Sequence, residues 1–373
     1  MRKYMAYAWI TMFVLMFMSA FFTYPFLSQF IDQRNLENRE KKEFSHPSLE
    51  NYTEYHQLFE EWYENNLPYR DILIQSNRKL ALYGFKESAS ESVVLGKDNW
   101  LFLSETIPDY KKINLYTLDQ LEVICTNLKS NYDYFQRRNI DFIVFIAPNK
   151  ASIYGEAFLP NYIYCEEGVS RTEQLVDYIR RNTDVPIVFP KDELSLIAKG
   201  YPEYPLYLHL DTHWNYLGGY CGVKSLLREL DHELPGVDEI VLEEFNSPVL
   251  IWNGYDLSNM LGMTGELTED TNYKIDYGSN NVVEWNGDTS TDIVDFYTFC
   301  QTASNAADHR KIMFIRDSFG SAMLPFIASE FREVYSPHVS FQTDSSTIDT
   351  VQPDVVIYEY VERGDLNNMM LFE

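Results

Sequence analysis

The chain has 373 residues, 45% of them apolar, and its 28 Tyr, 24 Phe and 6 Trp predict a folded protein with a large buried core. Acidic residues outnumber basic residues by 56 to 30, which gives a formal net charge of −26 at pH 7. Binding to a nucleic acid needs a basic face, so this charge argues against a nucleic-acid partner. An acidic polysaccharide would need a locally basic cleft to overcome the average field of the protein.

The N-terminus carries a long apolar run. It extends without charge from Tyr4 to about Phe30 and directly follows Arg2 and Lys3. A bilayer is spanned by about 20 residues, and basic residues before such a run favour an N-terminus inside and the remainder outside. A cleaved signal peptide is the alternative, but residues 18–22 form a poor cleavage site. We therefore expect residues 1–30 to be a single-pass anchor in the cell membrane.

Residues 31–91 predict a linker and a helical stalk. The segment 31–47 is charged and ends at Pro47, which suits a linker that leaves the membrane. The next segment, 48–65, carries apolar side chains at helical spacing, and a second helix is expected to follow Pro68 and to extend to Tyr83. The residues in the first stripe are Tyr52, Tyr55, Leu58, Phe59 and Trp62.

Residues 92–373 alternate between strand and helix patterns. A hairpin over 93–103 opens the segment, and strands that alternate with helices predict an α/β fold with a mostly parallel sheet covered by helices on both faces. Residues 237–305 interrupt this rhythm and are expected to form an insertion or lid of β segments. The expected strands are 141–146, 186–189, 311–315, 331–335 and 355–358, and the expected helices are 117–138, 169–182, 191–199, 216–230, 319–329 and 346–350.

Four cysteines are widely spaced and form no CxxC pattern, so they do not predict a metal cluster. Outside the cytosol they can form up to two disulfides, whose pairing the sequence does not give. Small buried thiols are the alternative. The cysteines are Cys125, Cys165, Cys221 and Cys300.

Two short motifs carry candidate chemistry. In 207–215, Asp211 and His213 are two residues apart, so on an extended backbone their side chains leave the same face. About a hundred residues later, Ser318 lies between the apolar run 312–315 and a predicted helix. A serine at such a turn is exposed and can meet an imidazole whose other nitrogen is held by a carboxylate. We expect Ser318 to be a nucleophile, His213 its base and Asp211 the group that orients the base.

These motifs resemble a known family. Asp211-Thr-His-Trp214 followed by Arg316-Asp-Ser-Phe-Gly320 is similar to the SGNH-hydrolase-like domain of alginate-type polysaccharide O-acetyltransferases, and most similar to its exported DHHW branch. In ordinary SGNH hydrolases the serine precedes the Asp and His, whereas the acetyltransferase branch has the order found here. The other matching segments are 36–39, 67–70, 96–102, 147–150, 256–261 and 353–357.

The resemblance implies a Ser-His-Asp O-acetyltransferase that acts on an exported polysaccharide or a cell-wall glycan. It also implies an integral membrane acyltransferase of the MBOAT type as the partner that supplies acetyl groups, and no cofactor. A carbohydrate acetylesterase with the same three residues is one alternative. The other is a non-catalytic protein of polysaccharide assembly or binding, although all three residue types needed for turnover are present.

Four further residues are candidates for an oxyanion hole or for substrate binding. Asn149 follows a predicted strand and can donate to an oxyanion through its amide, or it is a turn residue after Pro148. Lys150 can contact an acidic or acetylated sugar, or it is a solvated surface lysine. Arg316 can bind substrate or pair with Asp317. Trp214 can stack on a sugar ring or belong to the core.

A metal site is the alternative interpretation of the same motif. His209, Asp211 and His213 would line one face of a strand, and these are metal-ligand types. No cysteine or further acid is adjacent, and such short patterns arise by chance. No metal is expected.

Overall fold

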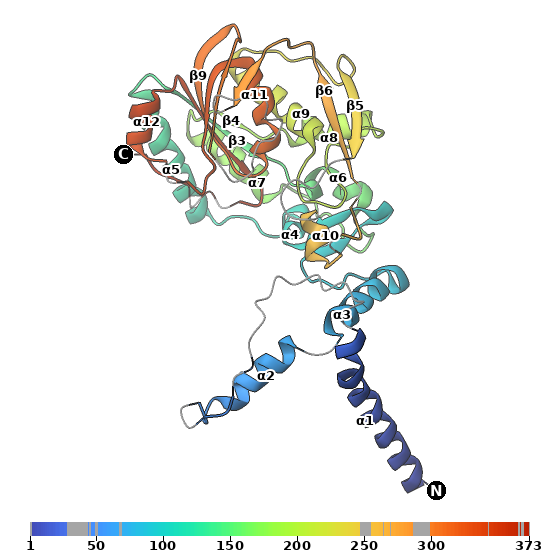
Figure 1. The fold of residues 1–373 in the computed structure, drawn as a ribbon. Coiled ribbons are helices and arrows are strands. Elements are labelled where there is room, and N and C mark those ends of the chain that lie inside the picture. Colours follow the sequence, from blue (N-terminus) through green and yellow to red (C-terminus); the bar gives the residue numbers. More distant parts are fainter. Residues whose placement is uncertain are drawn as a thin grey trace. The chain divides into compact units, whose positions relative to one another are not determined.

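A computed structural model gives the fold of the chain (Figure 1). It describes residues 2–27, 44, 46–48, 51–66, 69–246, 255–263, 265–268, 270–285, 299–341, 343–364, 366 and 369–372. The chain falls into two compact units, the first comprising Met1–Ser90 with Leu261–Thr264 and the second Glu91–Met260 with Gly265–Glu373.

The first unit is helical. It contains α1 (Arg2–Leu27), α2 (Tyr55–Asn65) and α3 (Arg70–Lys79), and α3 continues as a π-helical segment over Leu80–Phe85. The predicted linker lies almost wholly outside the described residues. Among the helices that the structure describes, none has both the length and the apolar character needed to cross a membrane. The membrane anchor expected over residues 1–30 is therefore not shown and stays a prediction.

A seven-stranded sheet forms the centre of the second unit. Its order is β4-β3-β11-β9-β10-β8-β7, with parallel pairing from β4 to β10 and antiparallel pairing at β8 and β7. The predicted α/β fold with a mostly parallel sheet is thus confirmed. In sheet order, the strands are Ile187–Val188, Asp141–Ala147, Val355–Val361, Asp308–Ile315, Phe331–Ser336, Cys300–Ser304 and Val283–Trp285.

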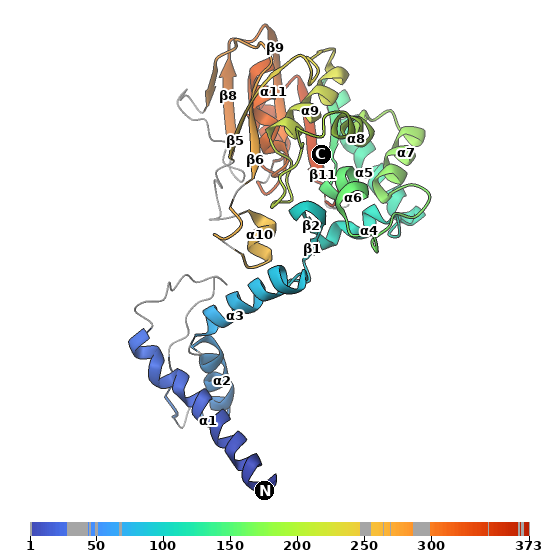
Figure 2. The same cartoon turned by 90° about the vertical axis from the view of Figure 1, so that its right-hand side faces the viewer.

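Helices cover both faces of this sheet. Strand side chains alternate between two cores, so Phe142, Val144 and Ile146 of β3 enter one core while Ile143, Phe145 and Ala147 enter the other. The first core contains α5 (Leu118–Gln136), α7 (Arg171–Asn182) and α12 (Ser345–Val351), and the second contains α6 (Lys150–Phe158), α8 (Lys191–Gly200), α9 (Tyr216–Leu227) and α11 (Leu324–Glu330). In Figure 2, α7 and α8 lie on the opposite side of the unit from β8.

Two small elements flank the sheet. The predicted hairpin is present as β1 (Val93–Leu95) paired with β2 (Leu101–Leu103), and the short helix α4 (Ile107–Tyr110) follows. The expected 237–305 insertion is only partly separate from the sheet. Strands β5 (Val241–Asn246) and β6 (Thr271–Asp276) pair with each other, but β7 and β8 extend the main sheet. Residues 247–254 and 286–298 lie outside the described part.

The four cysteines, all within the described residues, are free thiols. Three are buried, which agrees with the small-thiol alternative, and Cys165 is exposed. The structure therefore does not form the disulfides that the sequence left open.

Candidate active site

The site lies at the carboxyl edge of the parallel strands. Strand β3 ends at Ala147, β9 at Ile315 and β11 at Val361, and these three strands are neighbours in the order β3-β11-β9. The chain leaving each of them therefore emerges at the same edge, where ligand sites of α/β sheets lie. This edge holds Asn149 after β3 and Ser318 after β9.

The segment with Asp211 and His213 is a turn, and not the extended backbone on which the two side chains would leave the same face. An antiparallel bridge between Tyr207 and Trp214 closes it, and the Leu208 N–H donates to the His213 carbonyl at 3.1 Å. Inside the turn, the backbone N–H of His213 donates to Asp211 Oδ1 at 3.0 Å. Aspartate favours such local bonding to the backbone two residues on, and the turn itself brings the two side chains together.

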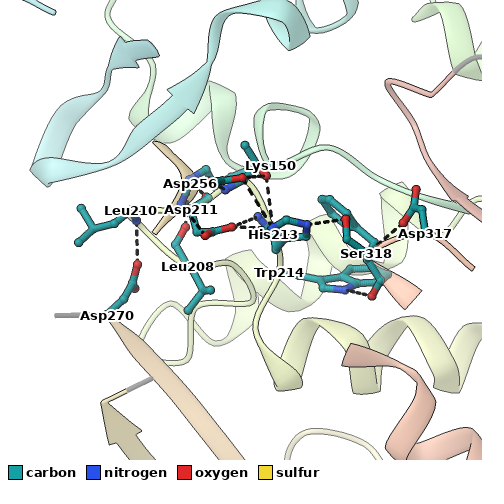
Figure 3. Close-up of polar contacts among 12 residues, drawn as sticks. Lys150, Leu208, Leu210, Asp211, His213, Trp214, Asp256, Asp270, Asp317 and Ser318 are labelled. Atoms are coloured by element: carbon teal, nitrogen blue, oxygen red, sulfur yellow. Dashed lines mark hydrogen bonds and ion pairs between the residues drawn. The ribbon is translucent and has the colours of Figure 1, made fainter. Parts of the chain in front are cut away.

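The structure joins Asp211, His213 and Ser318 in one hydrogen-bonded chain (Figure 3). Asp211 Oδ1 lies 2.6 Å from His213 Nδ1, and His213 Nε2 lies 2.7 Å from Ser318 Oγ. Since a carboxylate only accepts, Nδ1 carries the proton and Nε2 is free to accept from the hydroxyl. The imidazole also packs on the ring of Phe319, with 4.8 Å between the ring centroids. In this arrangement, His213 Nε2 can accept the proton of the Ser318 hydroxyl.

A second carboxylate, Asp256 at the start of α10 (Asp256–Met260), lies behind this chain. Its Oδ1 accepts from the Thr212 N–H at 2.7 Å, and its Oδ2 accepts a short bond from the Thr212 hydroxyl. The backbone N–H of Asp256 donates to Asp211 Oδ2 at 2.9 Å. Asp256 Oδ2 lies 3.8 Å from His213 Nδ1. The motif 256–261 contributed to the family resemblance, but nothing in the sequence gave Asp256 a place at His213.

Burial and charge act in opposite directions on these groups. Burial alone would raise the pKa of Asp211, but the adjacent His213 holds it below its ordinary value of 3.8. Burial lowers the pKa of His213, but the charge and hydrogen bond of Asp211 together with the charge of Asp256 raise it above 6.5. Burial and the Asp211 charge both raise the pKa of Asp256. Asp211 is therefore the ionised partner of the imidazole.

Buried groups from β11 fix the turn that carries Ser318. Glu359 is fully buried, and its Oε2 accepts from the backbone N–H groups of Asp317 at 3.0 Å and Gly320 at 3.1 Å. Asp317 Oδ2 in turn accepts from the Val361 N–H at 2.7 Å. A Cβ on residue 320 would lie 2.5 Å from Glu359 Oε2, so only glycine fits there. Burial and the Asp317 charge raise the pKa of Glu359 well above 4.5.

Two predicted substrate-binding residues, Arg316 and Trp214, lie inside the protein instead. Arg316 is 0% exposed and donates to Ser336 Oγ at 3.1 Å and to Ser321 Oγ at 2.7 Å, so its guanidinium does not face a ligand. Trp214 is 2% exposed, and its indole N–H donates to the Phe319 carbonyl at 2.9 Å. It belongs to the core and cannot stack on a sugar.

Lys150 is also buried, at 4% exposure, which contradicts both the substrate-binding and the surface interpretation. Its ammonium group donates to the backbone carbonyls of Leu208 at 3.0 Å, His209 at 3.1 Å and Asp211 at 2.6 Å. Figure 3 shows it next to Asp256 and above the Asp211–His213 pair.

Asn149 keeps its place as a candidate oxyanion donor. Its backbone N–H donates to Glu362 Oε2 at 2.8 Å, and its Oδ1 accepts from Arg363 at 3.3 Å. Its side-chain Nδ2 is buried and has no hydrogen-bond partner within the described residues. Because Arg363 binds the oxygen end, the amide presents its N–H groups elsewhere. A small pocket is lined by Asn149, Phe102, Leu103, Thr106, Lys150, Ala151, Thr212 and Arg363.

Arg363 is a site residue that the sequence did not reveal. It follows β11, its Nη2 lies 3.4 Å from Thr212 Oγ1, and its guanidinium is 5.0 Å from the Phe319 ring centroid. It therefore connects Asn149, the turn of His213 and the residue after Ser318. The only available signal was its position shortly after the predicted strand 355–358.

The alternative metal set is not formed, because His209 turns away from the other two residues. Its Nδ1 lies 3.1 Å from Asp270 Oδ1, and its ring packs on Trp100 with 4.2 Å between the centroids. Asp211, His213 and Asp256 do hold ligand-type atoms within 4.8 Å of one another. Those atoms already bond to each other and to Thr212, as described above.

The chain matches a known protein family. Residues 93–290, more than half of the chain, match the family described as ALGX, the SGNH hydrolase-like domain of acetyltransferase AlgX. A search among curated proteins gives no match.

Two solved structures have a similar fold. PatB1 from Bacillus cereus has a TM-score of 0.52 and 13% identity, over 73% of this chain and 98% of its own. A DHHW family protein from Eubacterium siraeum has a TM-score of 0.51 and 14% identity, over 75% and 99%. At these identities, the likeness shows the fold alone. Because the family match covers residues 93–290, the chain belongs to the ALGX family of SGNH hydrolase-like acetyltransferase domains, as its motifs indicated.

Proposed function

We propose that this protein is an exported, membrane-anchored O-acetyltransferase that acts on an extracellular polysaccharide or a cell-wall glycan. The family supports acetyl transfer as the class of reaction. The observation that carries the mechanism is the 2.7 Å contact between His213 Nε2 and Ser318 Oγ, on an imidazole whose Nδ1 is 2.6 Å from Asp211.

In the first half-reaction, Ser318 Oγ attacks the carbonyl carbon of an acetyl ester while its proton passes to His213 Nε2. Asp211 stabilises the resulting imidazolium. The negative charge on the carbonyl oxygen is stabilised by Asn149 Nδ2 and by the backbone N–H of Ser318. The C–O bond to the donor alkoxide then breaks, the alkoxide takes the proton from His213, and an acetyl-Ser318 ester remains.

In the second half-reaction, a sugar hydroxyl attacks the acetyl-Ser318 ester and gives its proton to His213 Nε2. The bond to Ser318 Oγ breaks, and the serine recovers the proton. No cofactor takes part. Water in place of the sugar would make the enzyme an acetylesterase with the same residues, so exclusion of water and seating of the sugar decide between the two activities.

Transfer is tested with the purified full-length protein, an activated acetyl ester and a panel of glycans, following the acetyl group by mass spectrometry. We expect acetylated glycan from the wild-type protein and none from His213→Ala, because the sugar hydroxyl then lacks its base. Free acetate released at one rate with every glycan, without acetylated product, would instead establish an esterase.

The acetyl donor is proposed to come from an integral membrane acyltransferase of the MBOAT type. An enzyme outside the cytoplasm has no acetyl-CoA, and an anchor would hold it near such a partner and raise their effective concentration. The proposed anchor rests on the sequence, where Arg2 and Lys3 precede the uncharged run 4–30.

Export and anchoring make a topology prediction. Protease added to intact spheroplasts should degrade residues 31–373, because the basic residues before the apolar run favour an outward-facing remainder. Immunodetection of the C-terminal part gives the readout, with a cytoplasmic protein as the protected control. Full protection of the chain until the membrane is lysed would contradict the topology.

A further inference from the structure

The ammonium group of Lys150 occupies an unusual position. Lys150 is the first residue of α6, directly after the carboxyl end of β3, and its side chain extends into the protein. An ammonium has three N–H donors and no acceptor. All three have partners in a single segment, the carbonyls of Leu208, His209 and Asp211, at 3.0, 3.1 and 2.6 Å.

This contact determines the path of the turn that holds Asp211. Three carbonyls from four consecutive residues converge on one point. The His209 carbonyl also accepts from the Leu101 N–H at 2.9 Å, but the carbonyls of Leu208 and Asp211 would lose their donor without the ammonium, and an unsatisfied buried acceptor is costly. The Asp211 carbonyl receives the shortest of the three bonds, and the side chain of the same residue bonds His213. Displacing this carbonyl would therefore displace the carboxylate that orients the imidazole.

Charge gives the ammonium a second effect. The carboxylates of Asp211, Asp256 and Asp270 all interact electrostatically with Lys150, and Arg363 is the other cation that acts on it. Three carboxylates in one region of a protein with a net charge of −26 repel one another. The buried cation offsets this repulsion, and the ring of Phe102, 5.4 Å from Nζ, adds a favourable contact.

We propose that Lys150 is a positioning residue, whose ammonium fixes the 208–211 turn and so keeps Asp211 in hydrogen-bond contact with His213. It does not touch substrate. The inference rests on the proposed function only in that Asp211 and His213 act on Ser318.

A substitution that keeps the volume but removes the charge tests the proposal. Lys150→Met removes the donor of the Leu208 and Asp211 carbonyls and one of the two donors of the His209 carbonyl. We expect it to abolish the far-downfield NMR signal of the proton between His213 and Asp211. We also expect the rate constant for phosphonylation of Ser318 by a fluorophosphonate to fall on the order of 100-fold, as misplacement by about 1 Å does. Lys199→Met, at an exposed lysine on α8, is the matched control and should change neither.

Restoring the ammonium separates positioning from a general loss of stability. In Lys150→Ala, added propylammonium replaces the missing atoms through the pocket that Lys150 lines, and it should restore both the NMR signal and the labelling rate. Propan-1-ol, nearly the same size without the charge, should restore neither. This pair of additives also decides the matter if Lys150→Met does not fold, since equal effects of the two additives would overturn the proposal.

The NMR signal does not depend on any reaction. If the wild-type protein shows this signal but Ser318 never reacts with the fluorophosphonate, the catalytic proposal fails. The positioning role of Lys150 is then still tested by whether Lys150→Met loses the signal. A folded Lys150→Met variant that retains the signal would overturn the role of Lys150 even when Ser318 is reactive.

Discussion

Replacing Ser318 by Ala should abolish both labelling by a fluorophosphonate and acetyl transfer, with a rate loss of about 10⁶-fold, the scale seen when the serine of another catalytic triad is removed. The physical reason is that His213 Nε2 then faces a methyl group, and no oxygen remains to form the acetyl ester. Mass spectrometry of the peptide containing residue 318, after incubation with an activated acetyl ester, should find the acetyl group on the wild-type serine only.

The control for this experiment is Ser346→Ala, which removes an exposed hydroxyl on α12, on the face opposite the helices α6 and α9. It should label like the wild type. Equal labelling of wild type and Ser318→Ala would mean that the probe reacts elsewhere, and the proposed nucleophile would have to be abandoned.

The sheet and its carboxyl edge could be predicted because local patterns determine them. Runs such as 141–146 and 355–358 are apolar on both faces, as buried parallel strands require, and the helices between them show helical periodicity. Parallel strands end at one edge, so the positions of Asn149 and Ser318 at that edge followed without knowledge of any contact. The start of α9 is equally local, since the Gly218 N–H donates to Asn215 Oδ1 and asparagine is a favoured residue at a helix N-terminus.

The surroundings of the triad could not be predicted in the same way, because long-range packing determines them. Whether Lys150 and Arg316 lie on the surface depends on carbonyls and hydroxyls of distant segments that satisfy their donors. Asp256 reaches His213 from 43 residues further along the chain, and Arg363 reaches Asn149 from the segment that follows β11. The sequence did not decide between a turn and an extended backbone at Asp211, because alternation with apolar residues occurs in both.

Replacing Asp211 by Asn should reduce the rate of Ser318 phosphonylation by about 10⁴-fold, the loss known for this exchange in another serine triad. The asparagine amide can donate to His213 Nδ1, which then becomes an acceptor and leaves the ring proton on Nε2. A protonated Nε2 cannot take the proton of Ser318. Asp256→Asn is the matched variant, and it should cost less because its Oδ2 is 3.8 Å from Nδ1 whereas Asp211 Oδ1 is at 2.6 Å.

Asp211→Asn should also shift the pH dependence of Ser318 phosphonylation. In the wild type, burial lowers the pKa of His213, but the charge and hydrogen bond of Asp211 together with the charge of Asp256 raise it above 6.5, so the neutral base forms, and the rate rises, only at higher pH. In Asp211→Asn, the main raising cause is gone, while burial and Arg363 still lower the pKa and Asp256 alone opposes them. The acid limb of the residual rate should therefore move to lower pH. An acid limb that stays in place while the rate falls would show that Asp211 does not act through His213, since removing its charge would then have left the imidazole unchanged.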